Sequence, residues 1–314
     1  MDLFLISLES VAALLGIGIL GYWIIRRRVI PENLMGFLAP LALDIALPSL
    51  VFISIVLQFN PADFPDWWKL PLIWIGFTAV LFALVMGTSL FSQKETRREF
   101  AISLFFQNGL FFPIFIITGV FGPESPYLVS LFLFLILHPP LVFGSYFLFF
   151  GKTKGAINWR RLLNPILVTT IIAVIVCLSS VQQYVPTFLV SIFQMLGGMA
   201  LPLLMLILGG NIYIDFKAQG KLYIWEAIKF TLTKNIIFPL VFIGLLYLVK
   251  LDYNISLIIF LQSAVPPITA IPILTERAGG NRNITTQFIF SSFVFSIISI
   301  PAMLFLFNHF FPAF

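Results

Sequence analysis

The chain has 314 residues, of which 60% are hydrophobic and only 10% are charged, and its formal net charge is +5. Soluble domains carry about a quarter charged residues, so this composition excludes a water-soluble globule, a disordered chain and a nucleic-acid-binding protein. The single cysteine, Cys177, excludes a disulfide framework and a cysteine-based zinc cluster. The composition predicts an integral membrane protein.

Ten apolar stretches are long enough to cross a bilayer, which takes about 20 predominantly apolar residues. In chain order we expect them at 3–25, 34–58, 68–91, 100–120, 127–150, 165–183, 187–211, 222–249, 254–276 and 285–308. The sequence therefore predicts an all-α membrane protein with ten transmembrane helices. The loops between these helices are short and leave no room for a soluble domain.

Lysine and arginine residues gather in every second loop. Of the 18, all but four fall in loops on one side; Lys69 and Lys250 lie on the other side, and Lys229 and Lys234 lie inside 222–249. Loops rich in Lys and Arg stay on the cytoplasmic side of a membrane. We therefore expect a plasma-membrane protein with both termini outside and a short cytoplasmic loop at 151–164.

Two short motifs recur at nearly the same offset. The Ala-Leu-Pro motif at 46–48 returns at 200–202, and the motif that begins at Gln107 returns at Gln262. An odd number of helices in each repeat turns the second repeat upside down in the membrane. We therefore predict two inverted five-helix repeats, 1–150 and 165–314, an arrangement typical of secondary transporters.

Prolines interrupt the fourth and ninth predicted helices near their middle. A proline inside a helix removes a hydrogen-bond donor, and unpaired backbone at bilayer depth is tolerated only where protein, water or a ligand satisfies it. The second half-helices, 111–120 and 267–276, would begin with free N–H groups and partial positive charge. Crossing at the midplane, these broken helices would bind a small anion such as a carboxylate; the alternative is a simple packing kink. The candidate substrate-binding residues are Asn108, Gly109, Pro113, Gln262, Ser263, Pro266, Pro267 and Thr269.

Three ionisable residues lie deep in predicted helices, where a charged group is costly and often marks function. Asp44 could take up a proton or a cation, or pair with a neighbour. Lys234 could attract an anion, or pair with an acid or a carbonyl group. His138 could couple protons, or be neutral and structural. These residues are candidates for coupling to a proton or a sodium ion; we predict no metal site and no other cofactor.

Taken together, several motifs resemble those of the auxin efflux carrier family. They are Gly21-Tyr22 before Arg26–Arg28, Leu47–Phe52, Gln107-Asn108 through Pro113 to Gly122, Asn164-Pro165, Leu196-Gly197 through Leu201-Pro202 to Leu208–Asn211, Lys234 before Pro239, and Ala264–Pro267 before Glu276. The resemblance implies a ten-helix fold shared with bile-acid sodium symporters. Helices one, two, six and seven would form a scaffold, and helices three to five and eight to ten a moving transport domain. It also implies small organic anions as substrates: malonate or malate in microbes, auxin in plants.

The chain departs from the family pattern in three places. The long plant carriers have a large hydrophilic loop between helices five and six, where this chain has only 151–164. No acid–lysine pair occurs in 68–91, which weighs against auxin as the substrate. Asp44 matches no residue of the family pattern.

The favoured function is a secondary transporter that moves a small organic anion by elevator-like alternating access. A passive anion channel and a non-transporting membrane receptor are the alternatives. The run Gly16–Gly21 matches a dinucleotide-binding pattern, but no strand precedes it, and close helix packing explains it better. No catalytic motif is present, so we expect no enzyme. The expected partners are the anionic substrate and the lipid bilayer, without nucleic acid; a homodimer is left open.

Overall fold

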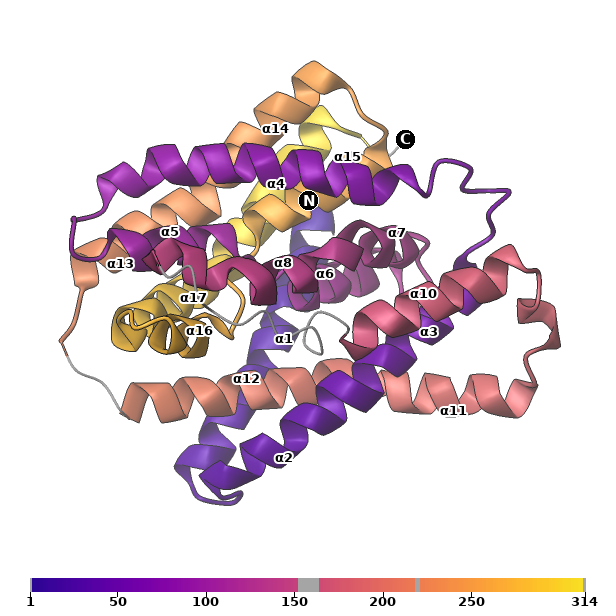
Figure 1. Cartoon of the computed structure of the whole chain (residues 1–314), viewed down its shortest axis with the longest axis horizontal. Coiled ribbons are helices and arrows are strands. Elements are labelled where there is room, and N and C mark those ends of the chain that lie inside the picture. Colours follow the sequence, from indigo (N-terminus) through magenta and orange to yellow (C-terminus); the bar gives the residue numbers. More distant parts are fainter. Residues whose placement is uncertain (1, 152–163, 218–220, 313–314) are drawn as a thin grey trace.

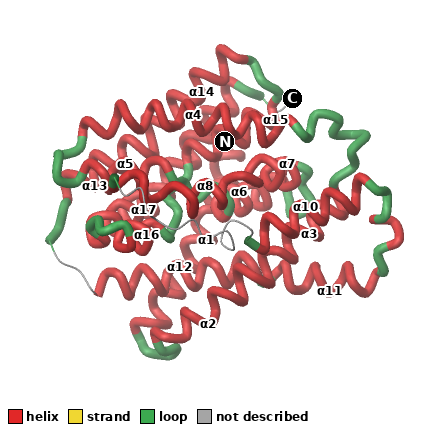
Figure 2. The backbone as a smooth tube through the Cα atoms, viewed as in Figure 1, coloured by secondary structure: helices red, strands yellow, loops and turns green. Residues whose placement is uncertain are grey.

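The computed structural model describes residues 2–151, 164–217 and 221–312. Within these residues the chain consists of helices joined by loops and turns, without a strand, as Figure 2 shows. The predicted all-α class is confirmed. The predicted cytoplasmic loop at 151–164 lies outside the described residues, apart from Gly151 and Asn164.

Seven helical segments in the described part of the chain are long and apolar enough to cross a membrane. They are Phe4–Arg26, Glu32–Gln58, Lys69–Phe91, Tyr127–Phe150, Thr187–Ile214, Ile224–Val249 and Arg282–Phe310. These segments coincide with seven of the predicted spans. Three further apolar helices are shorter: Phe111–Phe121, Pro165–Leu178 and Tyr253–Ala264.

The helices of the first half are α1 (Asp2–Arg26), α2 (Met35–Pro40), α3 (Leu47–Gln58), α4 (Lys69–Thr88), α5 (Arg97–Phe105), α6 (Phe111–Phe121), α7 (Tyr127–Phe134) and α8 (His138–Ser145). Those of the second half are α10 (Pro165–Leu178), α11 (Thr187–Gly198), α12 (Ala200–Lys217), α13 (Ile224–Leu232), α14 (Phe238–Val249), α15 (Tyr253–Ala264), α16 (Ile271–Arg277) and α17 (Arg282–Phe310). The 3-10 turns are η1 (Glu32–Leu34), η3 (Ser89–Phe91), η4 (Leu135–Leu137), η5 (Tyr146–Phe150) and η6 (Gln182–Tyr184).

The predicted helix at 165–183 is shorter than expected. It is α10, which ends at Leu178 because Ser180 adopts a left-handed conformation, with φ at 55°, that a right-handed helix cannot contain. Its 14 residues rise only about 21 Å, less than the roughly 30 Å of the hydrocarbon core. The prediction was wrong at this end.

Two π-helical turns interrupt longer helices just before a proline. They are η2 (Leu41–Ala46), between α2 and α3, and η7 (Thr233–Ile237), between α13 and α14. Pro48 has no N–H to offer the carbonyl of Asp44, and Pro239 has none for Asn235, so the hydrogen-bond ladder shifts here. Such turns often occur at functional sites. Asp44 and Lys234 both lie in them.

The helices form two groups, which Figure 1 shows on opposite sides of the molecule. In one group α3 packs against α10 and α11, and α1 packs against α12. In the other, α13 packs against α17 and α14 packs against α15. Contacts of α1 with α6 and α17 join the two groups. We call the first group, which consists of α1, α2, α3, α10, α11 and α12, the α3–α12 group. We call the second, which consists of α4 to α8 and α13 to α17, the α4–α17 group.

Close backbone contact and aromatic stacking both contribute to the packing within these groups. In the α3–α12 group, the backbones of α1 and α12 approach so closely that a side chain at Gly21 would overlap Leu206, and one at Gly209 would overlap Gly18. The run Gly16–Gly21 therefore includes glycines that allow close helix packing, as predicted. In the α4–α17 group, the rings of Phe230 and Phe288 stack 4.5 Å apart between their centroids.

Candidate functional site

The two broken helices meet where each is interrupted. The backbone N–H of Asn108 donates to the carbonyl of Pro266 over 2.8 Å, and the N–H of Ile268 donates to the carbonyl of Phe106 over 2.9 Å. Gln107 and Pro267 thus form a short antiparallel bridge. Backbone groups that have no partner within their own helix are therefore hydrogen-bonded to the other break. This pairing makes the two interruptions tolerable inside a membrane.

The side chain of Gln262 fills the contact between the breaks. Its Nε2 donates to the carbonyl oxygen of Gly109 over 2.7 Å, and its Oε1 accepts from Nε2 of Gln107 over 3.4 Å. The carbonyl of Gly109 is the one that Pro113, four residues later, cannot pair with. A side chain at Gly109 would overlap the Gln262 amide. Glycine is therefore required here for close approach, and Gln262 acts as a clamp between the two helices.

The half-helix predicted at 267–276 begins later than expected. Residues 265–268 are not helical, a turn follows at Thr269 and Ala270, and α16 begins at Ile271. The tandem prolines explain the delay, since a residue before proline is disfavoured in the helical conformation, and Pro267 is held in the bridge. Pro272 then lies in the first turn of α16, where its missing N–H costs nothing. The other half-helix, α6, begins at Phe111 as predicted.

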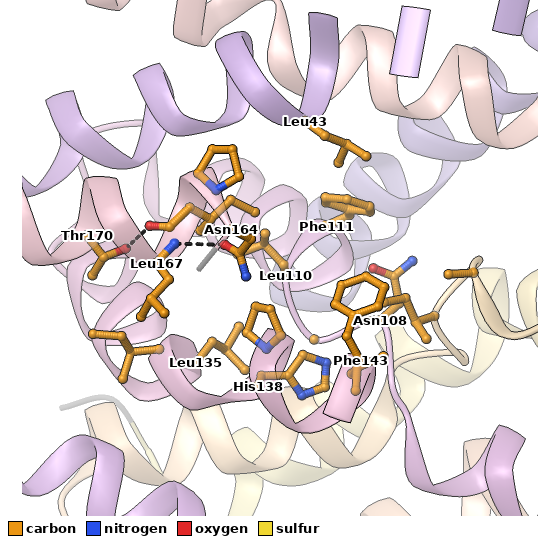
Figure 3. Close-up of a pocket in the computed structure, with 18 of the residues that line it drawn as sticks. Leu43, Asn108, Leu110, Phe111, Leu135, His138, Phe143, Asn164, Leu167 and Thr170 are labelled. Atoms are coloured by element: carbon orange, nitrogen blue, oxygen red, sulfur yellow. Dashed lines mark hydrogen bonds between the residues drawn. The ribbon is translucent and has the colours of Figure 1, made fainter. Parts of the chain in front are cut away.

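A cavity of about 500 Å³ lies beside this crossing. Its walls come from both helix groups: η2 and α10 on one side, and the two breaks with α7 and α8 on the other. The described lining residues are Leu43, Asp44, Asn108, Gly109, Leu110, Phe111, Phe132, Leu135, Ile136, His138, Pro139, Val142, Phe143, Asn164, Pro165, Ile166, Leu167, Thr170, Ile268, Thr269, Ala270 and Arg277. Figure 3 shows Asn108, His138 and Asn164 bordering the cavity from different elements. The cavity is mostly apolar, with a few polar groups at its edge.

Three buried nitrogen atoms on the cavity wall have no hydrogen-bond partner in the described part of the chain. They are Nδ2 of Asn108, Nδ2 of Asn164 and Nε2 of His138. An amide N–H always donates, and an imidazole nitrogen donates when it carries a proton. Buried polar groups in proteins are almost always paired, because an unpaired one costs about 1–3 kcal/mol. These three nitrogen atoms therefore keep hydrogen-bonding capacity that the described part of the chain does not use.

Asn164 also lines the cavity. In the sequence it stands out only as part of the Asn164-Pro165 motif of the family resemblance. Its Oδ1 caps α10 by accepting from the N–H of Leu167 over 2.8 Å, as Figure 3 shows. The Oδ1 is used for the cap, whereas the Nδ2 of the same amide has no hydrogen-bond partner in the described part of the chain. An Asn-Pro pair at a helix start predicts such a cap. It does not predict that the start faces a cavity.

The structure brings together only part of the predicted site. Asn108, Gly109, Thr269, Asp44 and His138 line the cavity. The remaining predicted residues, which do not line it, are Pro113, Gln262, Ser263, Pro266, Pro267 and Lys234.

Besides Gln262, two of these remaining residues are polar and completely buried: Ser263 and Lys234. The hydroxyl of Ser263 donates to the carbonyl of Phe260, one turn earlier in its own helix, over 2.6 Å. The ammonium group of Lys234 has no hydrogen-bond partner among the described residues and lies 5.6 Å from the ring centre of Phe238. A direct contact of either side chain with substrate stays a prediction, and the cavity wall offers no support for it.

One comparison with known proteins covers most of the sequence. The family described as "Membrane transport protein" matches residues 6–156 and residues 148–304. None of the curated proteins matches the chain.

Proposed function

We propose that this chain, which belongs to the auxin efflux carrier family of membrane transport proteins, is a secondary transporter of a small organic anion. The family and the apolar helices establish an integral membrane transport protein. That it has no enzymatic activity is part of the proposal. The observation that carries the anion proposal is the set of unpaired nitrogens of Asn108, Asn164 and His138, three residues that line one cavity from both helix groups.

A carboxylate suits this cavity in both chemistry and size. Its two oxygens accept several hydrogen bonds, and bonds to a charged acceptor are roughly twice as strong as those between neutral groups. A volume of about 500 Å³ lies within the usual range for small-molecule sites. The apolar remainder of the wall suits a carbon skeleton.

The proposed mechanism is an elevator-like exchange of access between the two sides of the membrane. The α3–α12 group would be the scaffold, and the α4–α17 group would carry the crossing and its substrate. Support comes from the position of the cavity, which is lined by residues of both groups, so that sliding one group past the other would open and close it. The ten-span, inverted-repeat arrangement of 1–150 and 165–314 belongs to the same proposal.

The recognition step is tested by binding and uptake of carboxylates in proteoliposomes. Losing a hydrogen bond to a charged group costs roughly 1.5–3 kcal/mol, so Asn108→Ala should weaken binding about ten- to a hundredfold. Asn164→Asp should weaken binding as well, because it keeps the capping oxygen but removes the donor. Asn60→Ala, in an exposed loop away from the cavity, is the matched control. Unchanged affinity in both cavity variants would refute the proposal.

Counterflow separates the transporter from the alternatives of a channel and a receptor. A transporter shows saturable uptake that is accelerated by unlabelled substrate on the other side. A channel shows flux without saturation, and a receptor binds the anion but moves none. Either of the last two results would replace the proposed mechanism.

The proposed topology is tested by labelling single cysteines in a background without Cys177. Cysteines near Asp63, Glu124 and Asp252 should react with an impermeant reagent from outside, and cysteines near Thr96, Lys154 and Ala218 should not. Labelling of position 154 from outside would overturn both the ten-span arrangement and the external termini.

The coupling ion, a proton or sodium, is tested by uptake at two pH values with and without sodium. Proton coupling predicts that transport varies with pH and that the double variant Asp44→Asn, His138→Gln flattens the profile. A protonated His138 would donate to the bound carboxylate, so anion and proton would favour each other's binding. An unchanged profile with strict dependence on sodium would exclude the proton.

A further inference from the structure

The cavity wall carries two opposite charges in addition to its neutral polar groups. Among the described lining residues, Arg277 is the only cation and Asp44 the only acid. Arg277 is the last residue of α16, in the α4–α17 group, and Asp44 lies in the π-helical turn η2, in the α3–α12 group. The two charges therefore enter the cavity from opposite helix groups.

Both charged side chains are available to a ligand. The neighbour of Arg277, Glu276, is used elsewhere, since its carboxylate accepts from Nη1 of Arg282 over 2.8 Å. Neither Arg277 nor Asp44 has a hydrogen bond or an ion pair within the described residues, and both side chains are exposed. Surface charges of a membrane protein can point to water for many reasons. These two, however, border the same cavity as the unpaired nitrogen atoms.

We propose that Arg277 and Asp44 act as a charge filter that restricts the cavity to monoanions. The inference rests on the proposed function and names its substrate class: a single carboxylate attached to a neutral, mainly apolar body. Arg277 and the amides of Asn108 and Asn164 balance one negative charge. Asp44 repels a second one.

The rest of the wall supports this substrate class. Aromatic and aliphatic side chains, including Phe111, Phe132 and Phe143, cover most of the space between the polar groups. A second carboxylate placed there would lose its water without gaining a second cation among the described lining residues. A hydrocarbon or aromatic body would instead gain from burial.

Electrostatics predicts a measurable preference. Two unit charges within about 8–10 Å, at the effective dielectric constant of about 20 typical of partly buried sites, change affinity by about tenfold or more. Asp44 should therefore weaken the binding of a dicarboxylate about tenfold relative to a monocarboxylate of the same skeleton. The preference should decrease when Asp44 loses its charge.

The test compares matched acids that differ by one carboxylate: butyrate with succinate, and benzoate with terephthalate. Binding is measured by thermal shift and titration, and uptake in proteoliposomes, for the full-length protein. The wild type should favour the monocarboxylate of at least one pair by about tenfold. Asp44→Asn should reduce this ratio toward one, and Arg277→Gln should weaken both members of the pair. Asp252→Asn and Arg98→Gln, exposed residues outside the cavity, are the matched controls.

The outcomes separate this inference from the proposed function. Because the readout is a ratio of affinities, a variant with a smaller folded fraction still reports it. Equal or tighter binding of the dicarboxylates by the wild type, or an unchanged ratio in Asp44→Asn, would overturn the charge filter and leave the anion transporter standing. If none of the four acids binds or is transported, the proposed function fails as well.

Discussion

The two interruptions of the membrane helices, at 106–110 and 265–270, contain related motifs but use their amide side chains differently. At the first, Nδ2 of Asn108 has no partner in the described part of the chain and lies on the cavity wall. Next to the second, Gln262 near the end of α15 is completely buried, and its amide is hydrogen-bonded to Gly109 and Gln107. Of these two amides, only that of Asn108 has a nitrogen left without a partner in the described part of the chain. The second holds the first break in place.

This difference shows how one kind of break can serve two purposes. A binding group needs an unsatisfied hydrogen-bonding capacity, whereas a positioning group needs a satisfied one. Both breaks depend on each other for backbone pairing, through Asn108 with Pro266 and Ile268 with Phe106. Removing the Gln262 side chain should therefore disturb the structure, and removing the Asn108 side chain should disturb recognition.

The largest effect is expected from removing the second break altogether. Replacing Pro266 and Pro267 by alanine should let α15 and α16 join in one helix and remove the bridge to Phe106 and Asn108. We expect transport to fall by at least about tenfold, equivalent to about 1.4 kcal/mol, with the protein still inserted. Pro301→Ala, at a proline inside the unbroken helix α17, is the control for loss of a proline. Full transport by the double variant would mean that the break is not needed.

Adding a methyl group at Gly109 should damage the contact between the breaks. In Gly109→Ala the new side chain would overlap the Gln262 amide, and such overpacking typically costs about 1–3 kcal/mol. The melting temperature of the purified protein should fall, and uptake should fall with it. Gly244→Ala, in α14, is the matched control because no atom lies within 4 Å of the new methyl group. Equal stability of the two variants would argue against close contact at Gly109.

Gln262→Ala tests whether Gln262 positions the first break, in contrast to Asn108, which we propose to contact the substrate. It leaves the buried carbonyl of Gly109 without its side-chain donor, at a cost of about 1–3 kcal/mol in unfolding free energy. We expect a lower melting temperature in Gln262→Ala but not in Asn108→Ala, whose side chain makes no such bond. Thermal unfolding without ligand measures this contrast. If Gln262→Ala keeps its stability and loses only affinity, Gln262 is a substrate ligand after all.

The smallest effect is expected at Thr269, which lines the cavity from the second break. Thr269→Val keeps the shape of the side chain and removes its hydroxyl. Loss of a neutral hydrogen bond is worth about 0.5–1.5 kcal/mol, so the affinity for a carboxylate should fall by about two- to tenfold, less than in Asn108→Ala. An effect as large as that of Asn108→Ala would place the carboxylate between the two breaks rather than beside the first.

Several features follow from the sequence because they depend on nearby residues. Runs of apolar residues indicate the membrane spans, since a polar backbone can cross a bilayer only with its hydrogen bonds satisfied inside the helix. Pro113, Pro266 and Pro267 locate the breaks, because a proline cannot donate in the helix that contains it. The motif match between Gln107 and Gln262 predicts a repeat, which stays a prediction; in the structure these two residues, 155 positions apart, are hydrogen-bonded to each other.

Only the tertiary structure decided which of these polar groups remain free. Asn108 and Gln262 look equally suited to bind an anion in the sequence, yet packing pairs one amide and leaves the other open. Asn164 enters the site because α10 begins at the cavity, and Lys234 stays away from the cavity wall although its charge suggested a role there. The physical reason is that hydrogen-bond satisfaction depends on partners brought together by the fold, often more than 150 residues apart, whereas helices and their breaks depend on neighbours in the chain.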